Sequence, residues 1–477
     1  MKLRPAHTLG LCFLFVCTLT HAEEARSGAA AAATASKPAA VTAPTGPSLQ
    51  VNYLQRVRNE DWNNIYDWND AKDDQRIQMR YKERFALLFK SPVVDFTAGL
   101  DTELNKKYAL NPTQVVANKF NSDEVVFEAL NVKLKKLPIP GLALTAGRMD
   151  LNKGEGFLLL EGSSGDGSRS TYFNAANLSY QHAKSTFELI GILDPRQDRF
   201  FPIIHNQHKY LNEWDEQGIA AYYTDRNHKN SDIDAYYFYK KEVNDYRAAT
   251  NVLFQPNRQV NTLGGRLAQR NFGGLSITGE LAGQWGKQHA NAKTAAPAKD
   301  IRAWGGYLYA KKSFDLAWKP TLQAGFIGLS GTDATNTSTI NGFDPLFSRW
   351  PKWSELYLYS LLPEKGVGYW SNDKMLQIEG TVTPIKPLTL RATLYEEYAF
   401  HPAGIVPATY GTGTHRGENY QFRGDYIFND KWRYHFLYEK FVPGDFYAGK
   451  DSVYFVQTQV VYQFTSKPLS LHHHAAQ

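Results

Sequence analysis

The chain of 477 residues contains two cysteines and four methionines. It has no long apolar run after its N-terminal segment. Because the two cysteines, Cys12 and Cys17, both lie in that segment, the rest of the chain can form neither a disulfide nor a thiol centre. No later stretch reaches the roughly 18 consecutive apolar residues that a membrane-spanning helix needs. Stability must therefore come from packing and strand pairing, and any passage through a membrane must use strands.

Motifs of catalysis and of cofactor binding are also missing. The glycine-rich stretch 162–168 lacks the Gly-Lys-Ser/Thr ending of a phosphate loop, so we interpret it as an outer loop. His205 and His208 have no spaced carboxylate partner, and the histidines of 472–474 stand in a tail beyond the last regular segment. The sequence predicts no enzyme, no cofactor and no metal site. The formal net charge of +6 is mild, and we expect no nucleic-acid partner.

The N-terminus has the features of a secretion signal. Lys2 and Arg4 precede an apolar stretch that ends in a small-x-small cleavage site at Ala22. The Ala- and Pro-rich stretch that follows has nothing to bury, which predicts a disordered leader. The predicted organisation is a signal over 1–22, the leader over 23–48, a barrel over 49–464, and a C-terminal tail without an assigned role over 465–477.

The last regular segment shows the pattern that recurs along the chain. Side chains alternate between two faces of a strand with a period of two. One face of this segment is aromatic and apolar, the other is wettable, and an aromatic residue closes it. The apolar face carries Tyr454, Val456, Thr458, Val460, Tyr462 and Phe464, and the other carries Gln457, Gln459 and Gln463. In an outer-membrane barrel this pattern places lipid outside and water inside.

Short and long connections alternate between the regular segments. After each hairpin-type break, such as 137–141, 271–274 or 384–387, one further strand leads to a long hydrophilic connection. Tight periplasmic turns and longer extracellular loops give outer-membrane barrels this parity. The longest connection, 331–373, is predicted to fold over or into the mouth. The segments are 49–58, 75–90, 93–104, 124–136, 142–150, 171–183, 186–193, 217–224, 232–240, 260–270, 275–286, 301–311, 320–330, 375–383, 388–399, 418–427, 432–441 and 452–464.

These observations predict an all-β fold, a transmembrane antiparallel β-barrel of about 18 strands. An even number of strands places both termini on the periplasmic side. A barrel of this size encloses an aqueous channel.

Charged residues within the strand patterns indicate the lumen face. In 75–85 the apolar residues alternate with cations, and only Glu83 breaks the alternation. A lysine or arginine facing lipid near the midplane costs about 2–4 kcal/mol, so the cations are expected to face water. By this test the lumen is lined by Arg76, Arg80, Lys82, Arg84, Lys133, Lys135, Arg266, Arg270, Glu280, Glu379 and Arg391.

Two interpretations of these cations stay open. In the first, they pair with lumenal carboxylates and only make a water-filled interior rigid. In the second, a surplus of Arg and Lys forms a positive track for an anionic solute. Interleaved Tyr and Trp would suit sugar rings, although aromatic residues are also expected at both membrane interfaces.

Several stretches resemble the alginate-export family of outer-membrane barrels. The similarity covers about 142–464 and extends loosely back to residue 75. Its most specific pieces are a Phe-Asp-Pro-Leu-Phe loop and a Pro-Gly-Asp motif. The resembling stretches are Leu144-Thr-Ala-Gly-Arg-Met-Asp-Leu151, Leu329-Ser-Gly-Thr-Asp333, Gly342-Phe-Asp-Pro-Leu-Phe347, Gly417-Glu-Asn-Tyr420 and Tyr438-Glu-Lys-Phe-Val-Pro-Gly-Asp-Phe446.

The resemblance implies a monomeric 18-stranded barrel that passes an anionic exopolysaccharide through an Arg-rich constriction. By motif match it assigns Arg148, Arg80 and Glu128 to the solute path. The chain departs from the family pattern where Phe127 precedes Glu128 and where Ser-Gly-Asp has become Ser-Gly-Thr-Asp. The final hairpin also carries no arginine at the positions of His435 and Leu437. The cargo is therefore left open.

The leading hypothesis is a porin-like channel in the outer membrane of a Gram-negative bacterium that passes anionic oligo- or polysaccharide, or other polar anions, through an Arg/Lys-lined lumen. One alternative is a general or uptake porin for small hydrophilic solutes. Another is a barrel enzyme acting on lipid or glycan at the outer rim. The expected partners are the lipid bilayer, the solute, and the outer-membrane insertion machinery, which would recognise the Tyr462-x-Phe464 end.

Overall fold

The computed structural model describes most of the chain that follows the predicted leader. The described residues contain strands and turns, and no helix among them is long and apolar enough to cross a membrane. The predicted signal, nearly all of the leader, the glycine-rich stretch 162–168 and the histidines of 472–474 lie outside them. The described ranges are 46–64, 68–71, 75–109, 124–160, 173–208, 211, 214–243, 257–290, 297–348, 352–356, 371–403 and 410–471.

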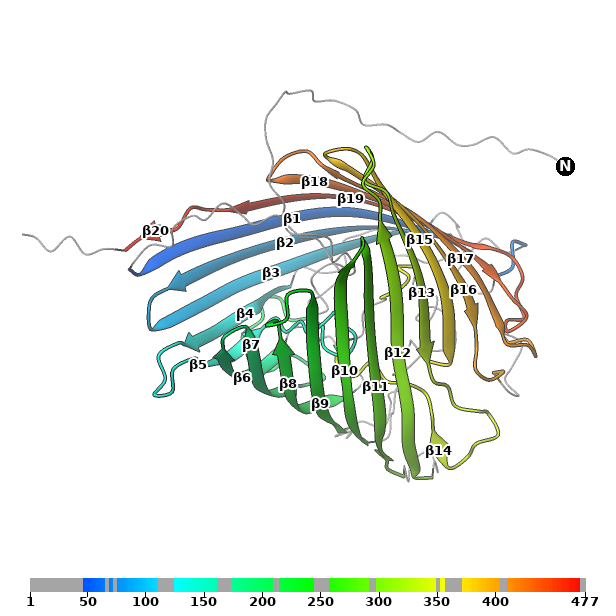
Figure 1. Cartoon of the computed structure of the whole chain (residues 1–477), viewed down its shortest axis with the longest axis horizontal. Helices are drawn as coiled ribbons and strands as arrows, with labels where there is room; N and C mark the ends of the chain where they lie inside the picture. Colours follow the sequence, from blue (N-terminus) through cyan, green and yellow to red (C-terminus); the bar gives the residue numbers. More distant parts are fainter. Residues whose placement is uncertain are drawn as a thin grey trace, which may run out of the picture.

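Twenty strands follow one another along these ranges (Figure 1). Eighteen of them are long and two contain only two residues. The strands are β1 (Ser48–Asn63), β2 (Arg76–Lys90), β3 (Val94–Ala109), β4 (Val125–Leu134), β5 (Leu142–Met149), β6 (Phe173–His182), β7 (Ser185–Asp194), β8 (Asp215–Asp225), β9 (Ser231–Val243), β10 (Arg258–Phe272), β11 (Leu275–Gln288), β12 (Lys299–Ser313), β13 (Thr321–Leu329), β14 (Thr339–Ile340), β15 (Asp373–Ile385), β16 (Leu388–Tyr398), β17 (His415–Ile427), β18 (Trp432–Pro443), β19 (Val453–Thr465) and β20 (Leu469–Ser470).

The long strands form one closed antiparallel ring. Each pairs with the next in sequence, and β13 pairs with β15 past the short β14. The ring closes where β19 pairs with β1, in a register that runs from Asn52 opposite Thr465 to Asn63 opposite Tyr454. The predicted all-β barrel of 18 antiparallel strands is therefore confirmed.

The two short strands attach to the ring. β14 runs parallel to the start of β12, with Thr339 opposite Asp300. β20 continues the C-terminal strand along the start of β1, and Ser470 lies opposite Ser48. Just before β20, the Ser466 hydroxyl accepts a hydrogen bond of 2.9 Å from the backbone N–H of Val51. This pairing gives the described part of the C-terminal tail a structural role that sequence reasoning did not find.

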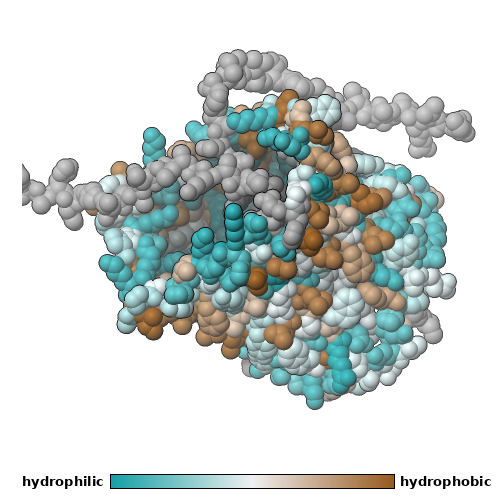
Figure 2. Space-filling view, in the orientation of Figure 1, coloured by the Kyte–Doolittle hydropathy of each residue, from teal (hydrophilic) through white to brown (hydrophobic). Residues whose placement is uncertain are grey.

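The two faces of the wall have opposite chemistry. On β2, Arg80 and Lys82 are 4% and 3% exposed, whereas the alternate residues Phe85 and Leu87 are 42% and 37% exposed. Burying charge and exposing apolar side chains reverses the pattern of a soluble protein, and it is the pattern of a wall with lipid outside. Figure 2 shows hydrophobic side chains gathered on the outer surface of the strands nearest the viewer.

Glu83, which breaks the alternation in β2, has a local partner. It accepts a hydrogen bond of 2.6 Å from the hydroxyl of Tyr53 on the neighbouring β1. The exception is thus stabilised by a cross-strand tyrosine rather than by an irregular strand.

A chain that ends at Thr465 should still form a stable barrel. The truncation removes β20 but leaves the whole β1–β19 register, from Asn52 to Asn63, intact. We expect a heat-modifiable band on unboiled gels. The temperature at which half of this band is lost should be slightly below that of the full chain. A chain that ends at Gln457 loses the half of β19 that faces Asn52–Asn59 and should lose the band. Equal behaviour of the two truncated chains would contradict this view of ring closure.

Candidate functional site: the barrel interior

The interior face of β1 and β2 carries cations in directly opposed positions. The register places Arg58 opposite Arg80, and Arg56 opposite Lys82. All four side chains are between 3% and 4% exposed. Directly opposed like charges destabilise a strand pair, so this arrangement needs a compensating network.

Carboxylates from β1 and β3 supply that network. Glu103 lies 2.9 Å from Arg80 Nε and 3.5 Å from Arg56 Nη2. Glu60 lies 3.3 Å from both Arg58 and Arg80. Lys82 pairs with Asp101 at 3.1 Å. Removing one member of such a buried network leaves an unmatched charge and costs about 3–5 kcal/mol.

A β-bulge places Glu128 within reach of this network. The register of β4 shifts so that Phe127 faces Leu100 and Ala129 faces Gly99, which leaves Glu128 as the extra residue. Bulges redirect a side chain in this way. The fully buried Glu128 carboxylate forms an ion pair with Arg84, at 2.8 Å from its Nε. The position at which the chain departs from the family's Arg-Glu pair is therefore a bulge that holds Arg84.

Cations and carboxylates are also paired on the opposite wall. Arg266 on β10 lies 3.2 Å from Asp234 on β9 and 3.1 Å from Glu155, which belongs to the connection after β5. This contact ties an inward-folded connection to the wall.

Glu280 and Glu379 both have partners on other strands. Glu280 accepts from the hydroxyls of Tyr236 and Tyr307, at 2.9 and 2.7 Å. Glu379 lies 3.6 Å from Arg391 Nε.

A third pair of opposed cations lies on β16 and β17. Arg391 faces Arg423 directly in the register. Arg423 is held by Asp425 at 2.8 Å, and His435 Nδ1 lies 2.9 Å from the same carboxylate. Three cation pairs, on two separate strand pairs, thus follow the same design.

The remaining predicted lining residues lie apart from these clusters. Arg76 is placed over the ring of Trp62, 5.0 Å from its centroid. Lys133 is exposed and lies opposite Asp95, whose carboxylate binds Lys135 at 2.6 Å. Arg270 belongs to the backbone of β10, and its side chain lies outside the described part.

Arg148 occupies a closed site rather than an open lumen. It is fully buried. Its guanidinium donates to the carbonyl oxygen of Phe127 at 2.8 Å, to Asp198 at 2.7 and 3.1 Å, and to Asn174 at 3.0 Å. Arg148 therefore holds three chain segments together, and its place in the solute path stays a prediction.

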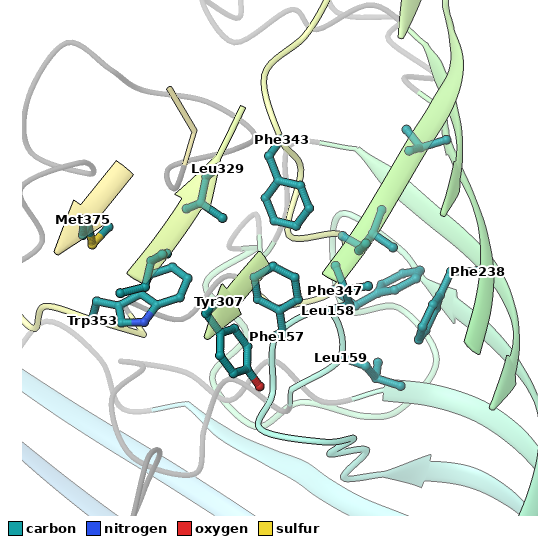
Figure 3. Packing of buried hydrophobic residues seen from close by; sticks show 14 of the residues in the cluster. Phe157, Leu158, Leu159, Phe238, Tyr307, Leu329, Phe343, Phe347, Trp353 and Met375 are labelled. Carbon is teal, nitrogen blue, oxygen red and sulfur yellow. The ribbon is translucent and has the colours of Figure 1, made fainter. Parts of the chain in front are cut away.

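The connection between β13 and β15 folds into the barrel (Figure 3). Phe343 stacks on Phe157 at a centroid distance of 5.1 Å, and Tyr307 of the wall packs edge-on against Phe157 at 5.5 Å. These rings belong to a buried apolar cluster that also includes Trp353 and Leu346. Burying aromatic rings against each other fixes both inward-folded connections in place.

Polar contacts fix the same connection to the wall. Asp344 lies 2.6 Å from Arg258 on β10, and the carbonyl oxygen of Leu346 accepts from Lys240 on β9 at 2.7 Å. Gln284 on β11 donates to the carbonyl oxygen of Asp344 at 2.7 Å.

Residues 354 and 355 of this connection reach the other side of the barrel. The Ser354 hydroxyl donates to Glu439 on β18 at 2.6 Å, and the backbone N–H of Glu355 donates to the same carboxylate at 2.7 Å. Gln457 on β19 donates to Glu355 at 3.0 Å. Residues 341–348 and 352–356 therefore form part of a partition across the interior, in agreement with the prediction that the longest outer connection enters the mouth.

Residues 69–460 match the family described as alginate export. The chain belongs to the alginate export family. No curated protein matches the chain in sequence. The predicted location in the outer membrane of a Gram-negative bacterium, with the bilayer as a partner, is confirmed, and the chain is an outer-membrane porin-like channel.

Solved structures of outer-membrane channels share the fold. OccAB1 of Acinetobacter baumannii has a TM-score of 0.54 at 10% identity, covering 88% of this chain and 97% of that one. OccAB4 of the same organism has a TM-score of 0.53 at 12% identity, with 87% and 98% covered. OpdK of Pseudomonas aeruginosa, solved with vanillate, has a TM-score of 0.51 at 10% identity, with 87% and 99% covered.

Two glycines of the wall make room for the Phe-Asp-Pro-Leu-Phe loop. A Cβ at Gly305 on β12 would lie 2.5 Å from the ring of Phe343. A Cβ at Gly218 on β8 would lie 2.5 Å from the ring of Phe347. Each ring therefore sits in a socket that only glycine leaves open.

A second family segment positions the start of the same loop. The Ser330 hydroxyl donates to the carbonyl oxygen of Asn341 at 2.6 Å and accepts from the Trp304 N–H at 2.8 Å. Thr332 Oγ1 accepts from the N–H groups of Asn341 and Gly342, at 2.8 and 3.0 Å. The two motifs thus act as one structural unit.

The Pro-Gly-Asp motif ties two outer connections together. The Asp445 carboxylate accepts a hydrogen bond of 2.9 Å from the backbone N–H of His415. The Gly444 N–H donates to the carbonyl oxygen of Arg416 at 2.7 Å. Its contacts are structural and involve no lumenal cation described above.

Sequence reasoning did not identify the residues that hold the partition. Asp344 and Glu439 were quoted within motifs without a role, and the glycines at 218 and 305 were not singled out. Glycine inside a strand pattern is a signal of close backbone or ring approach, and it marks both sockets.

Filling a socket should displace the partition. In Gly218→Leu or Gly305→Leu the new side chain collides with Phe347 or Phe343, and overpacking costs about 1–3 kcal/mol. Since the loop is the part that can move, we expect a higher single-channel conductance in planar bilayers with the barrel retained. Gly283→Leu is the control, because a Cβ at Gly283 meets nothing within 4 Å. Unchanged conductance in both socket variants would show that the partition does not restrict flow.

Proposed function

We propose that this channel passes anionic oligo- or polysaccharide, or related polar anions, by diffusion past its interior Arg and Lys side chains. The observation that carries the proposal is the opposed cations Arg58 and Arg80, beside Arg56 and Lys82. Opposed like charges lower the stability of a strand pair, so their presence at successive interior positions favours a role in solute passage.

The carboxylates around these cations make exchange with a solute possible. Glu60 and Glu103 bind the guanidinium groups through the same chemistry that the carboxylates of a uronate chain offer. A passing anion would compete with these protein carboxylates for the same guanidinium groups. Conduction requires this balance, because a solute must bind well enough to enter and weakly enough to leave.

The partition favours a second candidate for the solute. Because residues 341–348 and 352–356 cross the interior, the free cross-section is smaller than the ring of strands alone would give. Small polar anions fit this geometry as well as an extended saccharide chain does. We propose no catalytic role, and we expect a monomer that the outer-membrane insertion machinery assembles.

Neutralising the opposed cations should reduce anion selectivity. In the double variant Arg58→Gln, Arg80→Gln the net charge at this position becomes negative, since Glu60 and Glu103 remain. We expect the reversal potential in a salt gradient to shift toward cation preference. Arg302→Gln is the matched control, because Arg302 is exposed and lies opposite the exposed Trp285. An identical reversal potential in wild type and double variant would indicate an unselective porin.

Block of the single-channel current by added solutes tests which solute the channel passes. Oligouronates added to one side of a planar bilayer should interrupt the current, and neutral oligosaccharides of the same length should not. The block should weaken at high salt, because salt screens charge. If only small carboxylates block, the second candidate is correct. Turnover of lipid or glycan without conductance would instead point to an enzyme.

A further inference from the structure

The wall of the barrel is lowest between β4 and β5. Their register covers only Leu130–Leu134 against Leu144–Arg148. After Met149 the chain turns into the interior, where Leu151 is 4% exposed within the buried apolar cluster. Residues 125–129 of β4 are therefore left without a partner on β5.

The short strand does not reach across the apolar part of the membrane. β5 contains eight residues. At about 3.3 Å per residue and a tilt of about 40°, it rises roughly 20 Å along the membrane normal. The outward apolar band of such barrels is about 25 Å tall. The missing height lies at the extracellular end of β5, beside the outer leaflet.

The connection after β7 takes the place of the missing strand. Ile204 and Val125 exchange two backbone hydrogen bonds of 3.1 and 3.2 Å, as antiparallel partners do. The N–H of Gln207 donates to Glu124 at 2.7 Å. Irregular backbone can lie against lipid only where its polar groups are satisfied, and the exchange with Val125 satisfies both groups of Ile204.

Arg148 fastens this connection to the strands. Its guanidinium binds both carboxylate oxygens of Asp198 and also the Phe127 carbonyl oxygen, a group that no β5 residue pairs with. The Phe201 ring covers the guanidinium at 4.5 Å and lies 6.2 Å from the ring of Phe127. The charge is thereby enclosed between β4, β6 and the connection.

Apolar side chains of the same connection are exposed between residues 200 and 204. Phe200 is 43% exposed and Ile204 is 58% exposed. Phe127 lies directly opposite Leu100, an outward residue that is 38% exposed, so the three side chains continue the lipid-facing surface of β3. Exposed apolar side chains in a stretch expected to be a hydrophilic outer connection indicate contact with lipid.

We propose that residues 200–204 form part of the lipid-facing wall, in contact with the acyl chains of the outer leaflet. Arg148 is the positioning residue that holds them there. In this role Arg148 seals the wall and does not bind the solute. The inference rests on the fold alone and is independent of the proposed cargo.

Site-directed spin labelling in phosphatidylcholine vesicles tests the lipid contact. Cys12 and Cys17 lie in the predicted signal, so Ile204→Cys would be the single thiol of the exported chain. A nitroxide label attached to this thiol should be accessible to oxygen and inaccessible to a water-soluble nickel chelate. Leu189→Cys, on the outer face of β7, is the lipid standard, and Asp333→Cys, in an outer connection, is the aqueous standard. A label at 204 that behaves like the one at 333 overturns the proposal.

The role of Arg148 is tested in the same labelled chain. Arg148→Met removes the bonds to Asp198 and Phe127, so the label at 204 should gain access to the nickel chelate while the label at 189 stays unchanged. If Arg148→Met fails to assemble, Asp198→Asn keeps the volume and removes only the ion pair. An unchanged label at 204 in an assembled variant overturns the positioning role.

Discussion

The pairing of every wall strand with two neighbours is the constraint on which the rest of the structure depends. Backbone N–H and C=O groups cannot remain unpaired in a lipid environment, so a membrane sheet must close on itself. The β1–β19 register performs this closure, and β20 extends it beyond the ring. Where pairing fails, at the upper part of β4, the chain supplies a substitute from the connection after β7. Arg148 is completely enclosed beside this unpaired stretch of β4.

Closure also determines the chemistry of the interior. Because the outer face must be apolar, alternation sends every second side chain inward, and the inward positions hold the charges. Those charges are matched locally, as Arg80 is between Glu60 and Glu103 and as Lys82 is by Asp101. The first interpretation of the cations, pairing with carboxylates, is thus visible in the wall. The second, a positive track for an anionic solute, is part of the proposed function.

The interior is divided by connections rather than by strands. Two family motifs act together there, since Ser330 and Thr332 hold the start of the segment whose Phe343 and Phe347 enter the wall sockets. Glu439 receives the far end of the same segment. The partition is held mainly by aromatic packing, whereas the opposed cations of β1–β2 and β16–β17 belong to other parts of the wall.

The sequence by itself determined the class of fold and the number of long strands, and it predicted the inward face of those strands that carry charges. Period-two alternation and the parity of the connections are local signals, and they need no knowledge of distant contacts. It also placed Arg80, Lys82, Arg266 and Arg391 on the interior face of their strands. Only the tertiary structure decided what those cations bind, because their partners lie on other strands. It likewise decided that Glu128 sits in a bulge, that Gly218 and Gly305 are sockets, and that Arg148 joins β4, β6 and the connection after β7. Each of these depends on segments far apart in the chain that become neighbours only when the ring has closed.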